Sequence, residues 1–328
     1  MTMRILVKGA GVAGLTVAWQ LYRHGFDVTI AERNTATGLG ASGLAGGMLA
    51  PWCERESADE PVLTLGRRAA DWWEAALPGH VQRHGTLVVA AGRDAGELDR
   101  FAGRTSGWEW LDEAGIAALE PDLAGRFRRA LFFRQEAHLD PRRALAALTA
   151  GLEEARMRFL FGNGKEAGGY DRTVDCTGAA QIGRLPGLRG VRGEMLSLET
   201  GDVRLSRPVR LLHPRHAIYI VPRGENRFMA GATMIESDDA GPVTARSLME
   251  LLNAAYALHP AFGEARLTET GVGIRPTFPD NLPRVSETGH TLHVNGLYRH
   301  GFLLAPAMAG EVARRLLAER EQPERKAS

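Results

Sequence analysis

The stretch "MRILVKGAGVAGLTVAWQLYRHGFDVTIAER", Met3 to Arg33, sets how the chain begins to fold. Met3 to Val7 is a short apolar run typical of a buried parallel strand. A glycine-rich turn follows, then a helical pattern from Val12 to His24, with Gly25 where a helix commonly ends. Asp27 to Ala31 has the pattern of a second strand. This order predicts a strand–helix–strand unit with parallel strands.

The turn "GAGVAG", Gly9 to Gly14, matches the GxGxxG pattern, with a strand before it and a helix after it. Gly9 permits the tight turn, Gly11 lets the backbone approach a pyrophosphate, and Gly14 allows close packing of helix on strand. The helix N-terminus favours phosphate, and Glu32 ends the second strand where an acid can bind ribose hydroxyls. The unit predicts a dinucleotide site; the alternative is a turn without a ligand. The motif alone does not separate FAD from NAD.

Composition narrows the class of protein. The chain has 328 residues, enough for two domains, with 44% hydrophobic and 24% charged residues. A net charge of +1 gives no field that favours nucleic acid or an anionic membrane. No uninterrupted apolar run reaches membrane-spanning length, and Cys53 and Cys176 show no metal or disulfide spacing. We expect a cytoplasmic, soluble protein that binds neither membrane nor nucleic acid, and no metal site.

The remaining patterns predict an α/β fold with a separate β layer. Val191 to Ile235 alternates between strands and turns, and Gly224 to Asn226 would close a hairpin. Helices are expected from Thr64 to Leu77 and from Pro141 to Ala155, the latter with Asp140 as N-cap. We expect the β-rich block to cover the nucleotide-binding domain.

Two further stretches suit a flat ligand. "GASGLAGGMLAPWCE", Gly40 to Glu54, is too rich in small residues for a core element and suits a backbone that passes close to a ligand. The alternative is a flexible surface loop, and Cys53 within it is expected to be a small buried residue. "LYRHGFLLAPAMAGEVARRLL", Leu297 to Leu317, places a helix N-terminus where it can stabilise negative charge on a ring system. Taken in isolation, the segment favours the alternative of an ordinary loop-to-helix junction.

The segment "GVGIRPTFPDNLPRV", Gly271 to Val285, holds Arg275 between glycines and a rigid Pro276. A guanidinium fixes a carboxylate through two parallel hydrogen bonds, so it sets orientation as well as affinity. The alternative is a structural ion pair with Asp280, and the residues alone leave both open. Tyr219 lies on the expected hairpin, where a core tyrosine is the usual case. No catalytic triad, HExxH or paired-carboxylate motif stands out, so no acid–base residue is assigned.

The ordered set of motifs resembles the glycine oxidases of thiamine biosynthesis, within the D-amino acid oxidase family of FAD-dependent amine oxidoreductases. Each motif is weak alone, but together they follow the family's order and span nearly the whole chain. They are the glycine turn with Glu32, then "ASGLAGGMLAP", "VRGEM", "YIVPR", "GATM", "GIRPTFPD" and "YRHGFLLAPA".

The resemblance implies a Rossmann-type FAD-binding domain with a second, antiparallel-sheet substrate domain over the flavin. The expected ranges are about 1–75, 135–192 and 280–328 for the FAD domain, and about 76–134 and 193–279 for the substrate domain. FAD is expected to bind non-covalently. Residues 159–174 are fewer than the family usually has there, so adenine-side contacts are not transferred to them.

The resemblance also implies site residues. Arg275 would grip the substrate carboxylate with help from Tyr219, and Arg299 and Met234 would line the same pocket. The implied flavin contacts are Gly9, Gly11, Val12, Ala13, Gly14, Glu32, Arg33, Ala41, Ser42, Gly46, Gly47, Met48, Thr177, Gly178, Leu297, Tyr298, Arg299, His300, Gly301, Phe302 and Leu303.

The implied activity is FAD-dependent oxidative deamination of glycine and other small amines. Hydride would pass to the flavin, O2 would become H2O2, and the imine would serve thiazole formation. A D-amino acid or sarcosine oxidase, or a dehydrogenase with another acceptor, is a close alternative, because pocket volume decides the side chain tolerated. A non-catalytic flavin-binding subunit and an NAD dehydrogenase are the remaining alternatives. The family's tendency toward homo-oligomers is an expectation that the residues themselves do not test.

Overall fold

The computed structural model describes residues 2–162, 168–213 and 217–326. The chain opens with β1 (Arg4–Lys8), α1 (Val12–Arg23) and β2 (Asp27–Glu32), and β1 pairs with β2 in parallel. The expected strand–helix–strand unit is therefore confirmed. It forms the centre of a six-stranded sheet of order β15-β16-β9-β1-β2-β8. The other strands of this sheet are β8 (Arg158–Phe161), β9 (Arg172–Asp175), β15 (Arg284–Thr288) and β16 (Thr291–Asn295).

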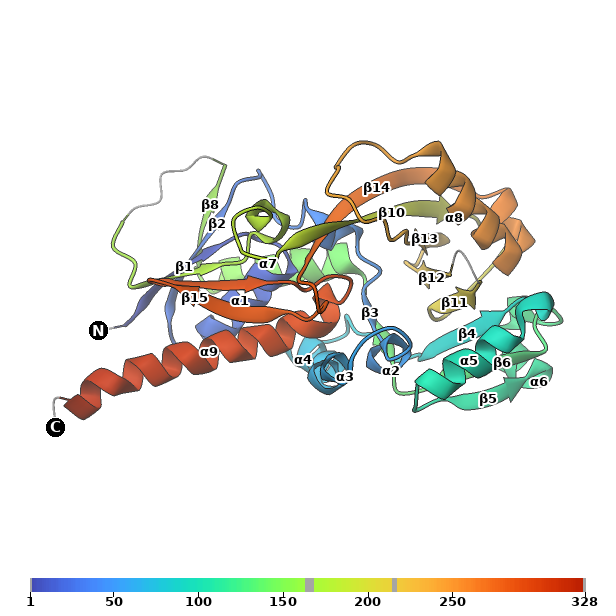
Figure 1. The fold of residues 1–328 in the computed structure, drawn as a ribbon, viewed down its shortest axis with the longest axis horizontal. Helices are drawn as coiled ribbons and strands as arrows, with labels where there is room; N and C mark the ends of the chain where they lie inside the picture. Colours follow the sequence, from blue (N-terminus) through green and yellow to red (C-terminus); the bar gives the residue numbers. More distant parts are fainter. Residues whose placement is uncertain (1, 163–167, 214–216, 327–328) are drawn as a thin grey trace.

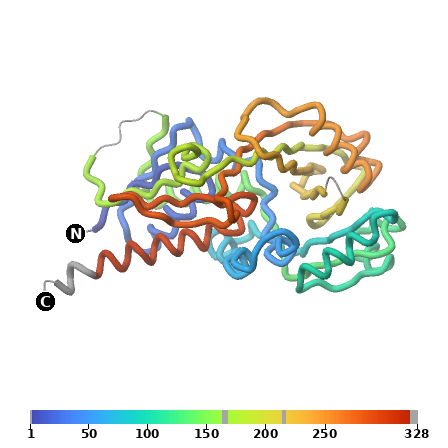
Figure 2. The backbone as a smooth tube through the Cα atoms, viewed as in Figure 1, coloured from blue at the N-terminus to red at the C-terminus, as the bar shows by residue number. Residues whose placement is uncertain are grey.

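Burial explains why the apolar run of β1 forms the middle of this sheet. Ile5, Leu6 and Val7 are at most 2% exposed, because β2 and β9 flank the strand and helices cover it. Both α1 and the long C-terminal helix α9 (Gly301–Lys326) contribute buried residues to the same core, and they pack on each other. Figure 2 shows the red C-terminal helix beside the blue N-terminal segment, so the two ends of the chain build one domain core.

A second sheet of eight strands has the order β14-β10-β13-β12-β11-β4-β6-β5. Neighbouring strands are antiparallel except for β4 and β11, which are parallel. The expected antiparallel sheet is therefore correct for every pair but this one. The expected hairpin is present as β12 and β13. The strands are β4 (Thr86–Ala90), β5 (Glu109–Asp112), β6 (Arg129–Phe133), β10 (Arg189–Glu199), β11 (Val209–Leu212), β12 (Ile218–Pro222), β13 (Arg227–Gly231) and β14 (Arg266–Thr277).

The other helices are short apart from α7 and α8. They are α2 (Pro51–Glu54), α3 (Glu60–Gly66), α4 (Ala69–Ala76), α5 (Gly96–Arg104), α6 (Glu113–Leu119), α7 (Pro141–Glu154) and α8 (Ala245–Leu258). Turns of 3-10 helix lie at Ala41–Leu44, Gly92–Asp94, Pro121–Leu123, Gly178–Gln181 and Pro260–Gly263. A two-stranded sheet of β3 (Met48–Leu49) and β7 (Ala137–His138) lies at the junction between the two large sheets.

Two expectations about helices had different outcomes. The Asp140 side chain accepts the N–H groups of Arg142 and Arg143 at 2.9 and 3.1 Å, so the predicted N-cap of α7 is confirmed.

The prediction of one helix from Thr64 to Leu77 is wrong. Two helices, α3 and α4, occupy this region, and the break falls between Gly66 and Ala69. Gly66 packs so closely on Leu303 that a Cβ there would lie 2.8 Å from that side chain.

The long strands β10 and β14 join the two halves of the molecule. They pair from Arg189 opposite Thr277 to Glu199 opposite Arg266, and one end of this pair in the second sheet reaches toward the first sheet (Figure 1). We propose that the two sheets are the centres of the two domains, with the residue ranges expected above. On that division β10 begins in one domain and continues into the other.

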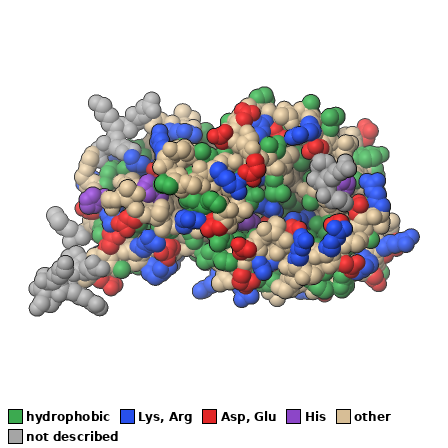
Figure 3. All heavy atoms as spheres, viewed as in Figure 1, with side chains coloured by type: hydrophobic (Ala, Val, Ile, Leu, Met, Phe, Trp, Pro, Cys, Tyr) green, Lys and Arg blue, Asp and Glu red, His purple; other side chains and the backbone are tan. Residues whose placement is uncertain are grey.

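The surface carries charges of both signs. On the face drawn in Figure 3, Lys and Arg side chains alternate with Asp and Glu without a large area of one sign. Within the described residues, no helix is long and apolar enough to cross a membrane.

Candidate active site

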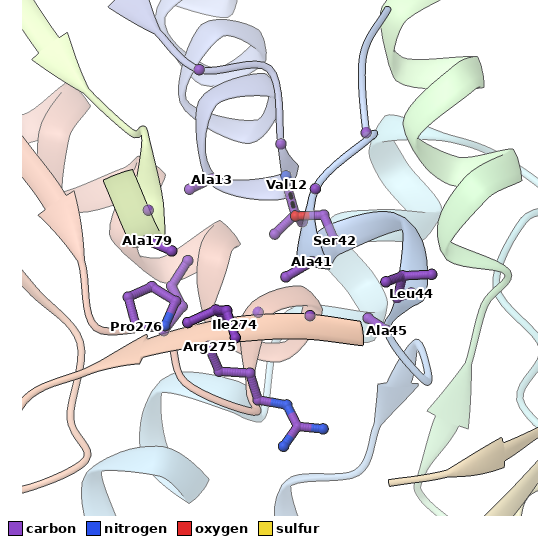
Figure 4. A pocket seen from close by; sticks show the side chains of 18 of the residues that line it. Val12, Ala13, Ala41, Ser42, Leu44, Ala45, Ala179, Ile274, Arg275 and Pro276 are labelled. Carbon is purple, nitrogen blue, oxygen red and sulfur yellow. Dashed lines mark hydrogen bonds between the residues drawn. The ribbon is translucent and has the colours of Figure 1, made fainter. Parts of the chain in front are cut away.

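A cavity of about 300 Å³ opens where the first sheet meets β14, a size at the small end for small-molecule sites. Figure 4 shows residues from the start of α1, the segment from Ala41 to Ala45, Ala179 and β14 around this space. Of the residues expected at the site, those on its wall are Gly9, Gly11, Val12, Ala13, Glu32, Arg33, Ala41, Ser42, Gly46, Thr177, Gly178, Tyr219, Arg275, Leu297, Tyr298, Arg299, Gly301 and Phe302. Segments as distant as β1 and α9 thus meet at one cavity.

The N-terminus of α1 is the first anion-binding feature of this cavity. Gly11 is its N-cap and supplies no side chain, so the first N–H groups are not capped by the residue in that position. The Val12 N–H donates instead to Ser42 Oγ at 3.1 Å, and a Cβ on Gly11 would lie 3.0 Å from that oxygen. The backbone donors, the helix dipole and a hydroxyl therefore converge on one small space, which suits a pyrophosphate.

Glu32 is fixed at the end of β2 on the wall of the same cavity. Its Oε2 accepts the Ala10 N–H at 2.7 Å, and its Oε1 accepts the backbone and side-chain N–H groups of Asn34 at 2.9 and 2.7 Å. The side chain is buried, yet each carboxylate oxygen can accept more than one hydrogen bond. The held carboxylate can accept ribose hydroxyls, as its place after the second strand led us to expect.

Arg275 lies on β14, where its side chain and those of its two neighbours in sequence point to opposite faces of the strand. In Figure 4 its guanidinium extends away from Val12 and Ala13, whereas Ile274 and Pro276 lie nearer to them. Its Nη1 donates to the carbonyl of Thr233 at 3.0 Å. Burial lowers the pKa of Arg275 below its ordinary value, but the group stays charged at neutral pH.

The alternative of an Arg275–Asp280 ion pair is wrong. The Asp280 carboxylate accepts from Arg284 Nη2 at 2.7 Å, on the surface. Arg275 donates to a neutral carbonyl, and within the described part of the chain no carboxylate lies at ion-pair distance from its guanidinium. A guanidinium in this state can receive an anionic ligand without first breaking an ion pair.

Small residues make room for the groups around Arg275. Gly193 on β10 faces Gly273 on β14, and a Cβ on Gly193 would lie 2.2 Å from the nearest guanidinium nitrogen. Gly46 serves Tyr219 in the same way, since a Cβ there would lie 2.8 Å from the phenol ring. Tyr219 therefore lies against the cavity wall and is only half-buried, so it is not the core tyrosine of the alternative interpretation.

The segment before α9 is tied to β14 directly beyond Arg275. The Tyr298 N–H donates to the carbonyl of Pro276 at 3.1 Å, and Tyr298 has a φ of +50°. A left-handed conformation at a bulky residue costs about 1–3 kcal/mol and persists where the surrounding structure holds it. Met234 is exposed and does not line the cavity, but its sulfur lies 3.4 Å from Arg299 Nη1 and 3.7 Å from the Tyr298 hydroxyl, and both of these residues do line it.

Glu54 is a residue beside the site that the sequence analysis did not identify. It ends α2, and its Oε2 lies 3.2 Å from Arg299 Nη2 and 3.5 Å from His300 Nδ1. Burial tends to raise the pKa of Glu54, but the charge of Arg299 foremost outweighs burial and the pKa falls to about 2. Glu54 is thus ionised at neutral pH and forms a nearly buried ion pair with Arg299. Glu54 is the last residue of the largely apolar stretch Gly40 to Glu54, and nothing in that stretch predicts an ion pair with Arg299.

Behind Glu54 lies a second buried acid, Glu136, which does not line the cavity. It is 0% exposed, its Oε1 accepts the Cys53 N–H at 2.7 Å, and its Oε2 has no hydrogen-bond partner among the described residues. Burial raises the pKa of Glu136 to about 7, and the charge of Glu54 acts in the same direction. Ionising Glu136 in the folded chain therefore costs free energy, so the folded state becomes less stable as this acid loses its proton.

Glu136→Gln is expected to stabilise the protein more at pH 8 than at pH 5. The unfolded carboxyl ionises above its ordinary pKa of 4.5, whereas the folded one stays protonated until about pH 7, so the wild type loses stability across that interval. The neutral amide does not titrate, and the gain should grow by about 2 kcal/mol between the two pH values. Urea unfolding of both proteins at each pH measures it. A difference independent of pH would contradict the prediction.

Six expected site residues lie off the cavity wall, each for a visible reason. Gly14 packs on the Gly9 carbonyl, Gly47 on Leu139 and Pro141, and Leu303 on Gly66. Met48 pairs with His138 in the small sheet, His300 faces Glu54, and Met234 is exposed beside Arg299 and Tyr298. Burial lowers the pKa of His300 to about 4, so its ring is neutral at pH 7. Residues 163–167 of the shortened region lie outside the described residues.

The wall also contains residues that the sequence analysis did not identify: Ala31, Asn34, Gly38, Leu39, Gly40, Leu44, Ala45, Cys176, Ala179, Ala180, Gly193, Met195, Ala232, Gly273, Ile274, Pro276, Val294 and Asn295. Half are glycine or alanine, so the wall is largely backbone. Cys53 is buried away from this wall, as expected of a small packed residue. Among the described residues no group of three His, Cys, Asp or Glu side chains could hold a metal ion.

Comparison with known proteins agrees with this geometry. The family model described as FAD dependent oxidoreductase matches residues 4–315. A Rhizobium etli protein named as a candidate thiamine biosynthesis oxidoreductase, ThiO, is 82% identical over 99% of this chain and 100% of its own length. A glycine oxidase of Bacillus licheniformis is 27% identical over 95% of this chain and 92% of its own.

Among solved structures, the glycine oxidase of Geobacillus kaustophilus superposes with a TM-score of 0.78 at 23% identity, covering 96% of this chain and 95% of that one. This likeness confirms the expected fold class, a Rossmann-type domain joined to a second domain built on its own sheet.

Proposed function

Because the chain belongs to the family of FAD-dependent oxidoreductases, we propose that it oxidises glycine and other small amines that carry one carboxylate. The observation that carries the proposal is the guanidinium of Arg275, which has no carboxylate partner among the described residues and lines the same cavity as the dinucleotide features. A carboxylate bound to Arg275 would lie in the same cavity as the residues that suit a dinucleotide, namely the N-terminus of α1, Ser42 and Glu32. Names of the similar Rhizobium and Bacillus proteins support glycine as the substrate and thiamine biosynthesis as the setting.

The residues present fit FAD. The N-terminus of α1, the Ser42 hydroxyl beside it and the held carboxylate of Glu32 match what a pyrophosphate and a ribose need, and the small-residue wall leaves room for a flat ring. We propose that these residues bind FAD without a covalent bond, which is consistent with Cys53 lying away from the wall. When bound, FAD supplies the two-electron acceptor for amine oxidation and passes the electrons to O2, giving H2O2.

The chain's own part is to position the substrate. Arg275 would hold the carboxylate in its plane and Tyr219 would donate a hydrogen bond to it, so the Cα–H is aimed at the acceptor before reaction. An amine that enters neutral assists the departure of hydride with its own lone pair and needs no side chain to take the Cα proton. His300, neutral and facing Glu54, fits this proposal, because it is not placed to act as a base.

An anaerobic titration tests the proposed function. Purified holoprotein is mixed with glycine, sarcosine or D-alanine, and the flavin absorbance near 450 nm is followed. We expect glycine to bleach the flavin and air to restore it with one H2O2 per cycle. Bleaching without peroxide under air would indicate a dehydrogenase, preferential bleaching by sarcosine or D-alanine would move the substrate assignment, and no bleaching by any amine would favour a non-catalytic flavin-binding subunit.

Tyr219→Phe is expected to raise the KM for glycine about three- to tenfold with FAD still bound. The change removes one hydrogen bond, worth about 1 kcal/mol, and leaves the ring on Gly46 in place. Steady-state oxygen consumption measures it. An unchanged KM would show that the hydroxyl does not contact the substrate.

Further parts of the proposal concern the setting of the enzyme. We propose a cytoplasmic location, which two buried free thiols support, since cysteines of secreted proteins are commonly paired. We also propose that the imine product is consumed in thiazole formation, and that the chain forms a homo-oligomer as family members do. Size-exclusion chromatography with light scattering tests the last point.

A further inference from the structure

Glu54 is a charged residue beside the cavity. The proposed function, in which Arg275 positions one carboxylate, gives it no role. Its side chain is 12% exposed, and its two oxygens face different arginines. Oε2 lies 3.2 Å from Arg299 Nη2, and Oε1 lies 3.8 Å from Arg210 Nη1. Arg299 and Arg275 both line the cavity, so Glu54 lies next to the place where a charged group of a ligand would bind.

The two buried arginines beside Glu54 both face a carboxylate. Arg299 pairs with Glu54, and Arg210 Nη2 lies 3.4 Å from a second acid, Glu56, which is also 3.6 Å from the exposed Arg104 Nη1. His300 is neutral at pH 7 because burial lowers its pKa to about 4. Among the described residues this leaves one cation of the group, Arg275, without a carboxylate at ion-pair distance. Arg275 is therefore the positive charge beside Glu54 that can receive a ligand's carboxylate.

We propose that Glu54 is a specificity-determining residue: by pairing with Arg299, it restricts the site to amines with one carboxylate and excludes dicarboxylates. The inference rests on the proposed function. A second carboxylate near Arg299 would have to approach a charge that Glu54 has already neutralised, and would meet the repulsion of Glu54 itself. The low pKa of Glu54, about 2, keeps that repulsion in force at every pH at which the enzyme would work.

Glu54→Gln tests the inference because it keeps the shape and removes the charge. The substrates are matched pairs that differ by one carboxylate: sarcosine with iminodiacetate, and D-alanine with D-aspartate. We expect the ratio of kcat/KM for the dicarboxylate to that for its partner to rise about ten- to a hundredfold over the wild type, the effect of one unit charge several ångströms away in a site of intermediate dielectric.

A binding measurement gives a readout that does not depend on turnover. Acetate and malonate are titrated into the holoprotein, and their dissociation constants are taken from the change in flavin absorbance. The malonate constant should fall relative to that of acetate in Glu54→Gln by the same factor as the kinetic ratio rises. Glu54→Ala provides the comparison if the glutamine variant does not purify with flavin.

Two controls separate charge from structure. Glu54→Asp keeps the charge and should keep the wild-type preference for monocarboxylates. Glu60→Gln removes an acid that lies 3.2 Å from Arg55 with its side chain 61% exposed, and it should leave every ratio unchanged. Unchanged ratios in Glu54→Gln, with the wild type active on glycine, would overturn the inference alone. A wild type whose flavin no amine reduces would overturn the proposed function as well.

Discussion

Replacing Arg275 with alanine is expected to lower kcat/KM for glycine about a thousandfold while FAD stays bound. The guanidinium can hold a carboxylate through two charge-assisted hydrogen bonds in a partly desolvated site, where losing one partner costs about 3–5 kcal/mol. Each 1.4 kcal/mol is about tenfold in rate or affinity. The wild-type guanidinium donates to a carbonyl and not to an acid, so its removal leaves no carboxylate of the described chain unpaired.

FAD should remain because Arg275 lies apart from the pyrophosphate and ribose features. Those depend on the N-terminus of α1 and on Glu32, and in Figure 4 the guanidinium extends away from Val12. Arg275→Lys is the matched variant, since it keeps the charge but cannot hold the carboxylate plane. We expect it to recover part of the affinity and little of kcat. Oxygen consumption and flavin content measure both variants. Near-normal glycine oxidation by Arg275→Ala would rule out the assignment.

The sequence predicted the first domain well because its signals are local. A buried strand, a glycine turn and an amphipathic helix each depend on neighbours within a few residues, and β1, α1 and β2 have the expected bounds to within one residue. The predicted single helix from Thr64 to Leu77 was wrong, and at Gly66, where α3 ends, the chain makes a distant contact. Gly66 packs against Leu303 of α9, which no pattern within the segment can indicate.

The same distinction applies to the site. Arg275 could be identified because rigid and small neighbours surround it in sequence. Glu54 could not, since its meaning comes from Arg299, which lies more than 240 positions further along the chain. Gly193 is intermediate: the "VRGEM" motif was quoted, but only the pairing of β10 with β14 shows that this glycine makes room for the guanidinium.

Gly14→Ala is expected to destabilise the protein by roughly 3 kcal/mol or more and to yield protein without FAD. Gly14 lies in α1, where alanine alone would favour the helix by about 1 kcal/mol. Its Cβ, however, would lie 1.8 Å from the Gly9 carbonyl oxygen and 3.5 Å from Cys176 Cβ. Backbone atoms cannot yield as a flexible side chain can, so the helix must move away from β1, and overpacking of this kind exceeds the gain in propensity.

Loss of FAD follows from the same displacement. The Gly9 carbonyl belongs to the turn that aims the N-terminus of α1 at the cavity, and a shift of that turn separates the backbone donors from Ser42. Gly310→Ala is the matched control, because it is also helical, in α9, and its Cβ would meet nothing within 4 Å. It should be neutral or slightly stabilising. Absorbance near 450 nm and urea unfolding compare the two variants. A Gly14→Ala protein with the wild-type flavin content would show that close packing of α1 on this turn is not what shapes the cofactor cradle.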